Sequence, residues 1–205
     1  MRLDVFLVKM GHFKSRNRAK IAISRGLVIV NGEVAKKPSM EVDPDANIVV
    51  LDDKPAGYWK LKDLDEKFGI FEGNEIVLDL GSSAGGFLLY ASEKAKFVYG
   101  IEFSREFEEE LREIEEKRKN VKVFIDDVFT FDIEKIEPVD VILNDLTLDF
   151  ESSMLALKRF LPKLKKGGKI LFVCKNCRAE FKEFEVVAFE SAERKRESYY
   201  LLRPK

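Results

Sequence analysis

The sequence first narrows the possibilities by what it does not contain. No stretch among its 205 residues is apolar over the roughly 18 residues that a membrane helix requires. The first ten residues, "MRLDVFLVKM", carry charges where a signal peptide would be apolar. Two cysteines in a chain of this size do not make a disulfide framework. These absences predict a soluble, cytoplasmic protein with no membrane partner.

Histidine and cysteine are also too scarce to suggest a metal site. Cys174 and Cys177 form one C-x-x-C pair, and the single histidine, His12, is remote from them in the sequence. A structural zinc site needs four ligands, so we predict no bound metal and expect the two cysteines at a strand end. His12 is expected to be structural or to face RNA rather than to be catalytic.

The total charge of −1 conceals a strong asymmetry. Residues 1–38 contain nine lysines and arginines against two acidic residues, a net charge of +7, which leaves −8 for the remainder. A basic module joined to an acidic body indicates that one part of the protein meets a polyanion. The alternative is a solvated lysine-rich face, and composition alone does not separate the two.

The pattern inside the basic module favours the polyanion. Apolar spacing predicts one helix that Gly11 ends and a second that Ser15 caps and Gly26 ends. "LVIVNGEV" predicts a β-hairpin, because both residues of an Asn-Gly turn accept positive φ. A further strand, "NIVVL" at 47–51, would close a small sheet behind the helices.

This order of elements resembles the S-four RNA-binding domain, on the stretches "RLDVFLV" and "SRNRAKIAISRGLVIVNGEVAKKP". The resemblance implies that the second helix and the hairpin loop bind structured RNA through phosphate contacts, which fix position without reading sequence. Some of the arginines are expected to pair with local carboxylates instead. The implied RNA-binding residues are Lys14, Arg16, Arg18, Lys20, Arg25, Lys36 and Lys37.

A second domain follows a short connection. Pro55 and Gly57 in "LDDKPAGYWK" interrupt the periodicity, so we predict an RNA-binding domain at 1–52, a linker at 53–59 and a second domain at 60–205. Aliphatic strands then alternate with helical stretches, which predicts an α/β fold with a doubly wound parallel sheet. The predicted strands are Ile76–Leu80, Phe97–Glu102, Val121–Ile125, Val139–Asn144 and Lys169–Cys174.

The glycine-rich stretch "VLDLGSSAGGF" after the first of these strands predicts a ligand site. It lacks the Gly-Lys-Ser/Thr of a P-loop and the G-x-G-x-x-G of a dinucleotide turn. Acidic residues follow the next strands: Glu102 can accept ribose hydroxyls, and Asp127 or Asp126 can face an adenine edge. This ordered set suits S-adenosylmethionine, although Glu102 and Asp127 could simply be helix caps. The predicted cofactor-binding residues are Asp79, Gly81, Ser82, Gly85, Gly86, Phe87, Glu102, Asp127 and Asp145.

The second domain resembles the FtsJ-type (RrmJ-type) ribose 2'-O-methyltransferases and, with the front module, the TlyA/hemolysin-like rRNA methyltransferases. Four stretches carry the resemblance in order: "GYWKLKDLDEKFGIF", "VDVILNDL", "LFVCKN" and "RKRESYYLL". They imply a Rossmann-like fold and a catalytic set of Lys60, Asp145, Lys175 and Glu197. The chain departs from the family pattern at Ala84, where proline or threonine is frequent, and in "NDLTLD", where no proline follows the acid.

The proposed chemistry fits those residue types. A ribose hydroxyl is a poor nucleophile, and methyl transfer demands in-line alignment, so a base and a clamp are needed. Lys175, crowded by Lys60, is expected to have a lowered pKa and to accept the 2'-OH proton. Asp145 would orient its ammonium, while Lys60 and Glu197 would hold the nucleotide.

Other interpretations remain open at this point. A protein that binds RNA on a methyltransferase fold without turnover would share every feature except activity. A small-molecule methyltransferase would leave the basic module unexplained. A pore-forming hemolysin is disfavoured, because the sequence has no span or strongly amphipathic membrane stretch. The sequence indicates ribosomal RNA only through the family resemblance.

Overall fold

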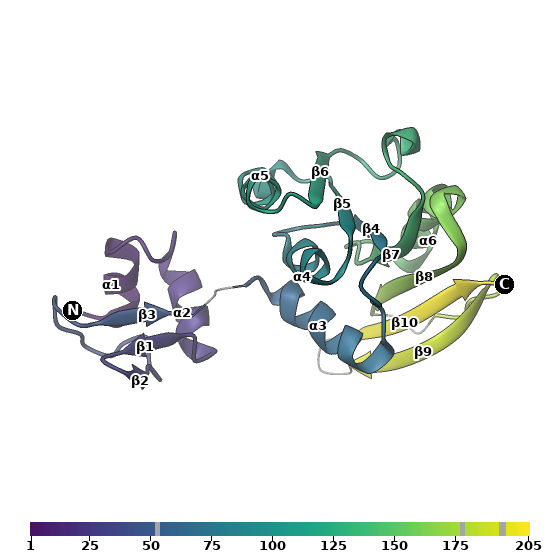
Figure 1. The fold of residues 1–205 in the computed structure, drawn as a ribbon. Coiled ribbons are helices and arrows are strands. Elements are labelled where there is room, and N and C mark those ends of the chain that lie inside the picture. The colour runs from purple at the N-terminus through teal and green to yellow at the C-terminus, as the bar shows by residue number, and fades with distance from the viewer. Residues whose placement is uncertain (52–53, 177–178, 193–195) are drawn as a thin grey trace. The chain divides into compact units, whose positions relative to one another are not determined.

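The computed structural model describes residues 1–51, 54–176, 179–192 and 196–205. The chain divides into two compact units, residues 1–54 and 55–205 (Figure 1). Each unit has a hydrophobic core of its own. Among the described residues, no helix has the length and apolar character to cross a bilayer.

The first unit is a small α+β domain. Helices α1 (Leu3–Lys9) and α2 (Arg16–Ser24) cover a three-stranded antiparallel sheet in the order β2-β1-β3. The strands are β1 (Val28–Val30), β2 (Glu33–Val34) and β3 (Ile48–Val50).

The local signals of the first unit act as predicted. The Ser15 side chain accepts a hydrogen bond from the Arg18 backbone N–H and so caps α2. Asn31 and Gly32 both have positive φ, which a two-residue hairpin turn requires between β1 and β2. The predicted pair of helices, hairpin and third strand are therefore confirmed.

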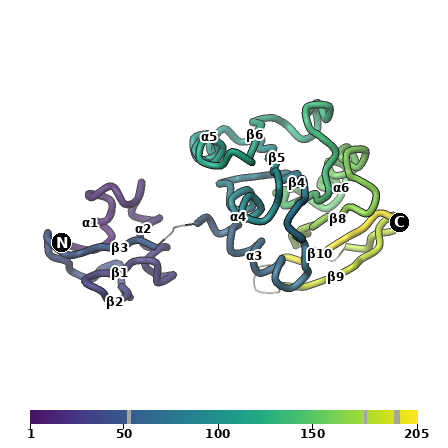
Figure 2. The backbone as a smooth tube through the Cα atoms, viewed as in Figure 1, coloured from purple at the N-terminus to yellow at the C-terminus, as the bar shows by residue number. Residues whose placement is uncertain are grey.

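The second unit is built on a seven-stranded sheet in the order β6-β5-β4-β7-β8-β10-β9. All neighbouring strands are parallel except β10, which runs antiparallel to both β8 and β9. The chain forms β9 before β10, although β10 lies between β9 and β8 (Figure 2). The strands are β4 (Ile76–Leu80), β5 (Phe97–Glu102), β6 (Val121–Ile125), β7 (Val139–Asn144), β8 (Leu164–Lys175), β9 (Phe184–Ala192) and β10 (Glu197–Pro204).

The sheet buries both faces because successive strand residues point to opposite sides. Val77 belongs to the core on one face and Leu78 to the core on the other. Helices α3 (Ala56–Phe68), α4 (Gly86–Lys94) and α5 (Glu108–Lys117) pack on the first face, and α6 (Phe150–Phe160) packs on the second. This is the predicted doubly wound α/β architecture.

Two boundaries differ from the sequence predictions. Strand β8 begins five residues before the predicted Lys169, at Leu164, and helix α3 begins at Ala56, inside the predicted linker 53–59. Pro55 stands at the N-cap of α3, where a missing N–H costs nothing. Gly57 lies in the first turn of this helix, in contact with Gly86. Residues 56–59 are therefore helical, and the linker prediction was wrong for them.

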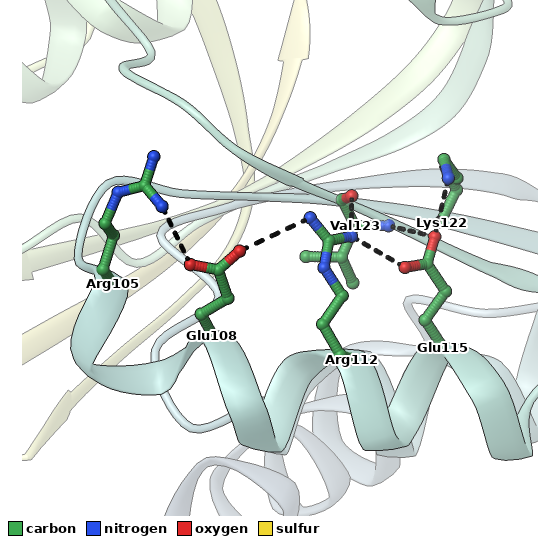
Figure 3. Close-up of polar contacts among 6 residues, drawn as sticks. All are labelled: Arg105, Glu108, Arg112, Glu115, Lys122 and Val123. Atoms are coloured by element: carbon green, nitrogen blue, oxygen red, sulfur yellow. Dashed lines mark hydrogen bonds and ion pairs between the residues drawn. The ribbon is translucent and has the colours of Figure 1, made fainter.

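The edge strand β6 is covered by side chains from α5 (Figure 3). Arg112 donates to the carbonyl of Val123, and Glu115 accepts from the N–H of the same residue. An unpaired strand edge can recruit a foreign strand, and these two bonds occupy it at this point. Arg105, Glu108 and Lys122 extend the pair into a line of alternating charges.

Candidate active site

The glycine loop between β4 and α4 brings distant parts of the chain together. A Cβ at Gly86 would lie 2.6 Å from the backbone nitrogen of Tyr58 and 2.8 Å from the Cα of Gly57, so only glycine lets α4 approach the start of α3. A Cβ at Gly85 would collide with the side chain of Ile114. The loop is thus constrained by its protein neighbours, which position α3 and its Lys60.

Gly81 has the same effect on the loop after β7. It has a φ of 83°, and a Cβ there would lie 3.0 Å from Leu146 and 3.5 Å from the carbonyl oxygen of Asp145. The turn that carries Asp145 can therefore lie directly against the end of β4. The glycine-rich loop assembles the polar residues around it as well as leaving space beside it.

The four residues of the predicted catalytic set lie together in the structure. Lys60 Nζ is 2.8 Å from Asp145 Oδ2 and 3.1 Å from Glu197 Oε2, and Lys175 Nζ is 3.2 Å from Asp145 Oδ1. They come from α3, the loop after β7, the end of β8 and the start of β10. Because β10 is antiparallel to β8, its first residue Glu197 stands in register with Lys175, the last residue of β8.

A neighbouring tyrosine fixes the outer carboxylate of this network. The Tyr199 hydroxyl donates to Glu197 Oε2 at 2.6 Å, and the Lys60 ammonium lies 5.5 Å from the centre of the Tyr199 ring. Burial would raise the pKa of Glu197, but the Tyr199 hydrogen bond and the Lys60 charge outweigh it and leave that pKa below its usual value. Burial and the bond to Glu197 both raise the pKa of Tyr199, so this hydroxyl remains a donor.

The network opens onto a cavity of about 420 Å³. Three of the four residues line it, while Lys175, which contacts Asp145, is not among the lining residues and has a side chain that is 25% exposed. The other lining residues belong to the glycine loop and to the first turns of α3 and α4. The lining residues are Pro55, Ala56, Gly57, Lys60, Gly81, Ser82, Ser83, Ala84, Gly86, Phe87, Asp145 and Glu197.

Asp79 is buried at the end of β4, and neither of its carboxylate oxygens has a hydrogen-bond partner among the residues that the structure describes. Its pKa is raised to about 8, chiefly by burial and also by the nearby carboxylates of Asp145 and Glu102, against the effect of Ser82. A fully buried acid without a partner is costly unless a ligand completes it. An amino group is a suitable partner, and the expected cofactor carries one.

The two acids that follow β5 and β6 already make local hydrogen bonds. Glu102 accepts from the backbone N–H groups of Ser83 and Ser104, each at 2.7 Å, and so ties the glycine loop to the end of β5. Asp127 accepts from Phe129, and Asp126 accepts from Asp127. Each carboxylate oxygen keeps a second lone pair for a ligand. Ribose binding by Glu102 and adenine binding by Asp127 or Asp126 stay predictions.

The seven predicted RNA-binding residues are all exposed on the first unit. The guanidinium of one of them, Arg16, donates to the buried carboxylate of Asp4 at 2.9 Å beside Arg2. Arg16 therefore has a structural partner, as expected for some of the set.

Sequence reasoning did not single out three residues of this region. Thr147 accepts a hydrogen bond from Lys175, and Tyr199 donates one to Glu197. Phe103, directly after Glu102, is 74% exposed, which is unusual for a phenylalanine. Only Tyr199 had a sequence signal, since it lies in the quoted "RKRESYYLL".

The two cysteines can be placed only in part. Cys174 is buried near the end of β8, and Cys177 lies outside the described residues. Within the described ranges, no group of three or more His, Cys, Asp or Glu is placed to hold a metal.

Comparison with known families matches both units. The model of the S4 domain covers residues 1–48, and the model of the FtsJ-like methyltransferase covers residues 56–204. YqxC of Bacillus subtilis, provisionally named an rRNA methyltransferase, is 28% identical over 174 residues, which are 80% of this chain and 58% of that protein. Hemolysin A of Brachyspira hyodysenteriae is 35% identical over 107 residues, or 50% of this chain and 44% of that one.

The fold also matches a solved structure with a cofactor. Fibrillarin from Aeropyrum pernix, crystallised with natively bound S-adenosyl-L-methionine, superposes with a TM-score of 0.58 at 18% identity, over 72% of this chain and 76% of that one. At this identity the likeness concerns the fold. The chain spans about half the length of the curated relatives that it matches.

Proposed function

The chain belongs to the FtsJ-like methyltransferase family, and we propose that it methylates a ribose 2'-oxygen of RNA, with ribosomal RNA as the expected substrate. The single observation that carries the proposal is the network of Lys60, Asp145, Lys175 and Glu197 beside one cavity. Two lysines that share one carboxylate provide both a fixed cation and a candidate base. A site for base methylation would not need this pair.

S-adenosylmethionine is the cofactor that fits the glycine loop, and when bound it supplies an electrophilic methyl group on a sulfonium. Asp79 would accept a hydrogen bond from the amino group of its methionine part, because this buried carboxylate has no hydrogen-bond partner within the described ranges. Glu102 would accept the ribose hydroxyls through its remaining lone pairs. Phe103 offers an exposed ring beside Glu102 against which an adenine could pack.

The two lysines have different surroundings, which supports a different role for each. Lys60 is 14% exposed and contacts two carboxylates, so in this proposal it holds the substrate ribose or phosphate. Lys175 contacts one carboxylate and a neutral hydroxyl. Lys175 has fewer carboxylate contacts than Lys60, so it is the candidate to accept the proton of the 2'-hydroxyl. Glu197, held by Tyr199 and Lys60, would accept a hydrogen bond from the nucleotide.

The first unit would deliver the RNA. Its exposed cations can neutralise phosphates, and this contact is independent of sequence. The choice of target nucleotide would then depend on the shape of the RNA that both units can reach.

The test is methyl transfer from labelled S-adenosylmethionine to total ribosomal RNA, followed by digestion to locate the label. We compare the intact protein with Lys175→Met, a substitution that keeps a long side chain and removes the amine. The matched control is Lys62→Met, since Lys62 is another lysine on α3, with a side chain that is 42% exposed and pairs with Glu66. We expect label on a ribose 2'-oxygen, a fall of about 100-fold or more in Lys175→Met and a change below about twofold in the control.

Other outcomes would reject the proposal in different ways. Label on a base would keep the cofactor and remove the role of the lysine pair. Full activity in Lys175→Met would exclude this lysine as the base. If the wild type shows neither transfer nor calorimetric binding of the cofactor, the protein is a non-catalytic RNA-binding member of the family.

A further inference from the structure

The loop after β7 contains a contact that the catalytic set does not include. Lys175 Nζ donates a hydrogen bond to Thr147 Oγ1 at 3.1 Å. Thr147 lies in "NDLTLD", two residues after Asp145, and is exposed. Because Thr147 is exposed, packing of its side chain does not account for this hydrogen bond. The effect of the bond is therefore expected at Lys175.

The geometry around Asp145 makes Thr147 the directing acceptor for Lys175. Asp145 Oδ1 is 3.2 Å from Lys175 Nζ, close enough for an ion pair, yet within the described parts of the chain this oxygen has no partner with hydrogen-bond geometry. The other oxygen, Oδ2, accepts a hydrogen bond from Lys60 at 2.8 Å. The carboxylate thus attracts one N–H bond of Lys175 by its charge but aligns it poorly, and Thr147 supplies the well-aligned hydrogen bond that sets the rotation of the amine.

The number of N–H bonds on a neutral lysine amine indicates what this contact can do. A neutral amine has two N–H bonds on the side-chain nitrogen and one lone pair. If one N–H is given to Thr147 and the other faces Asp145, the lone pair occupies the only remaining tetrahedral direction. We propose that Thr147 is a positioning residue that fixes the lone pair of Lys175 toward the 2'-hydroxyl. The inference rests on the proposed function, in which Lys175 is the base.

The test compares two substitutions at one position. Thr147→Val keeps the branched shape and removes the hydroxyl, whereas Thr147→Ser keeps the hydroxyl. We expect the single-turnover rate of Thr147→Val to fall about tenfold with cofactor and RNA affinities within about twofold of wild type, since misalignment affects the reacting state. Thr147→Ser should recover most of the rate. Thr130→Val, a change to another exposed threonine, serves as the control and should leave the rate unchanged.

A double substitution separates positioning from a merely structural effect. In the Lys175→Met background, Thr147→Val should cause no further loss, because its effect passes through the lysine amine. A wild-type rate in Thr147→Val would overturn the inference, as would an equal loss in Thr147→Ser. An additive loss in the double variant would overturn it too. Failure of the proposed function is distinguishable, because the wild type would then transfer no methyl to ribose.

Discussion

Asp4 in the first unit and Asp79 in the second are both fully buried, yet their surroundings are opposite. Asp4 receives hydrogen bonds from Arg2 and Arg16, while neither carboxylate oxygen of Asp79 has a hydrogen-bond partner in the described part of the chain. The hydrogen bond from Arg2, together with Arg16 and against burial, lowers the pKa of Asp4 to about 2. Burial raises the pKa of Asp79 to about 8.

The different surroundings of Asp4 and Asp79 indicate a different role for each acid. A buried charge that the chain itself pairs serves the fold, because its cost is offset within the folded protein. A buried acid left without a partner costs stability, and such sites persist where a ligand completes them. Asp145 combines both conditions, since two lysines pair with it while it lines the cavity.

The largest expected effect tests the ligand role of Asp79. Asp79→Asn keeps the shape and cannot become an anion, so we expect the affinity for S-adenosylhomocysteine to fall about 100-fold or more, as befits loss of a charge-assisted bond in a buried site. The unfolding temperature at pH 8 should rise, because the cost of the buried acid is removed. Calorimetric titration and thermal unfolding measure the two. An equal loss of cofactor affinity in Asp4→Asn would contradict the different roles assigned to Asp4 and Asp79.

The pH dependence of cofactor binding is expected to be about tenfold per unit. Below pH 8 Asp79 is protonated in the free protein and must lose its proton to hold an ammonium group, so affinity should fall as pH falls from 8 to 6. Titrations of S-adenosylhomocysteine in two buffers of different ionisation enthalpy should reveal about one proton released. A cofactor affinity that does not change with pH would show that Asp79 does not bind the ammonium group of the ligand.

Asp4 and Asp79 should also affect stability with opposite signs. Between the folded pKa of about 2 and the ordinary aspartate pKa of 3.8, the unfolded chain binds the extra proton at Asp4, so its stabilising effect is lost as pH falls through this range. At Asp79 the folded chain binds the extra proton from 3.8 to about 8, so stability falls as pH rises there. NMR amide signals of α1 in the intact chain, compared with Asp4→Asn, measure the first effect. Equal acid sensitivity in both proteins would contradict it.

Local sequence signals predicted much of the fold. Asn31-Gly32, the Ser15 cap and the aliphatic runs are short-range features, and the hairpin, α2 and the parallel strands follow them. Strand β9 was missed because its exposed edge, with Val187 and Phe189 partly in solvent, does not follow a buried-strand pattern. Gly57 was taken for a linker signal, since its close contact with Gly86 is visible only in three dimensions.

The residues of the candidate site could be predicted only where the sequence resembles the family pattern. Lys60, Asp145, Lys175 and Glu197 are far apart in the sequence, and the β-sheet register brings them to one edge. Their catalytic roles stay predictions. Thr147 could not be inferred, because a single threonine in a loop has no pattern, and its importance depends on where Lys175 Nζ lies.

The smallest expected effect separates the two kinds of cation on α2. Lys20 and Arg16 are both exposed on this helix, but Arg16 is already paired with Asp4, whose charge offsets its own. We expect Lys20→Ala to weaken RNA binding severalfold and to reduce the salt dependence of binding by about one counterion. Arg16→Ala should leave that salt slope nearly unchanged while destabilising the first unit, because it removes a partner from buried Asp4. Filter binding of ribosomal RNA across salt concentrations measures both slopes, and equal slopes would show that the paired arginine reaches phosphate as readily as the lysine.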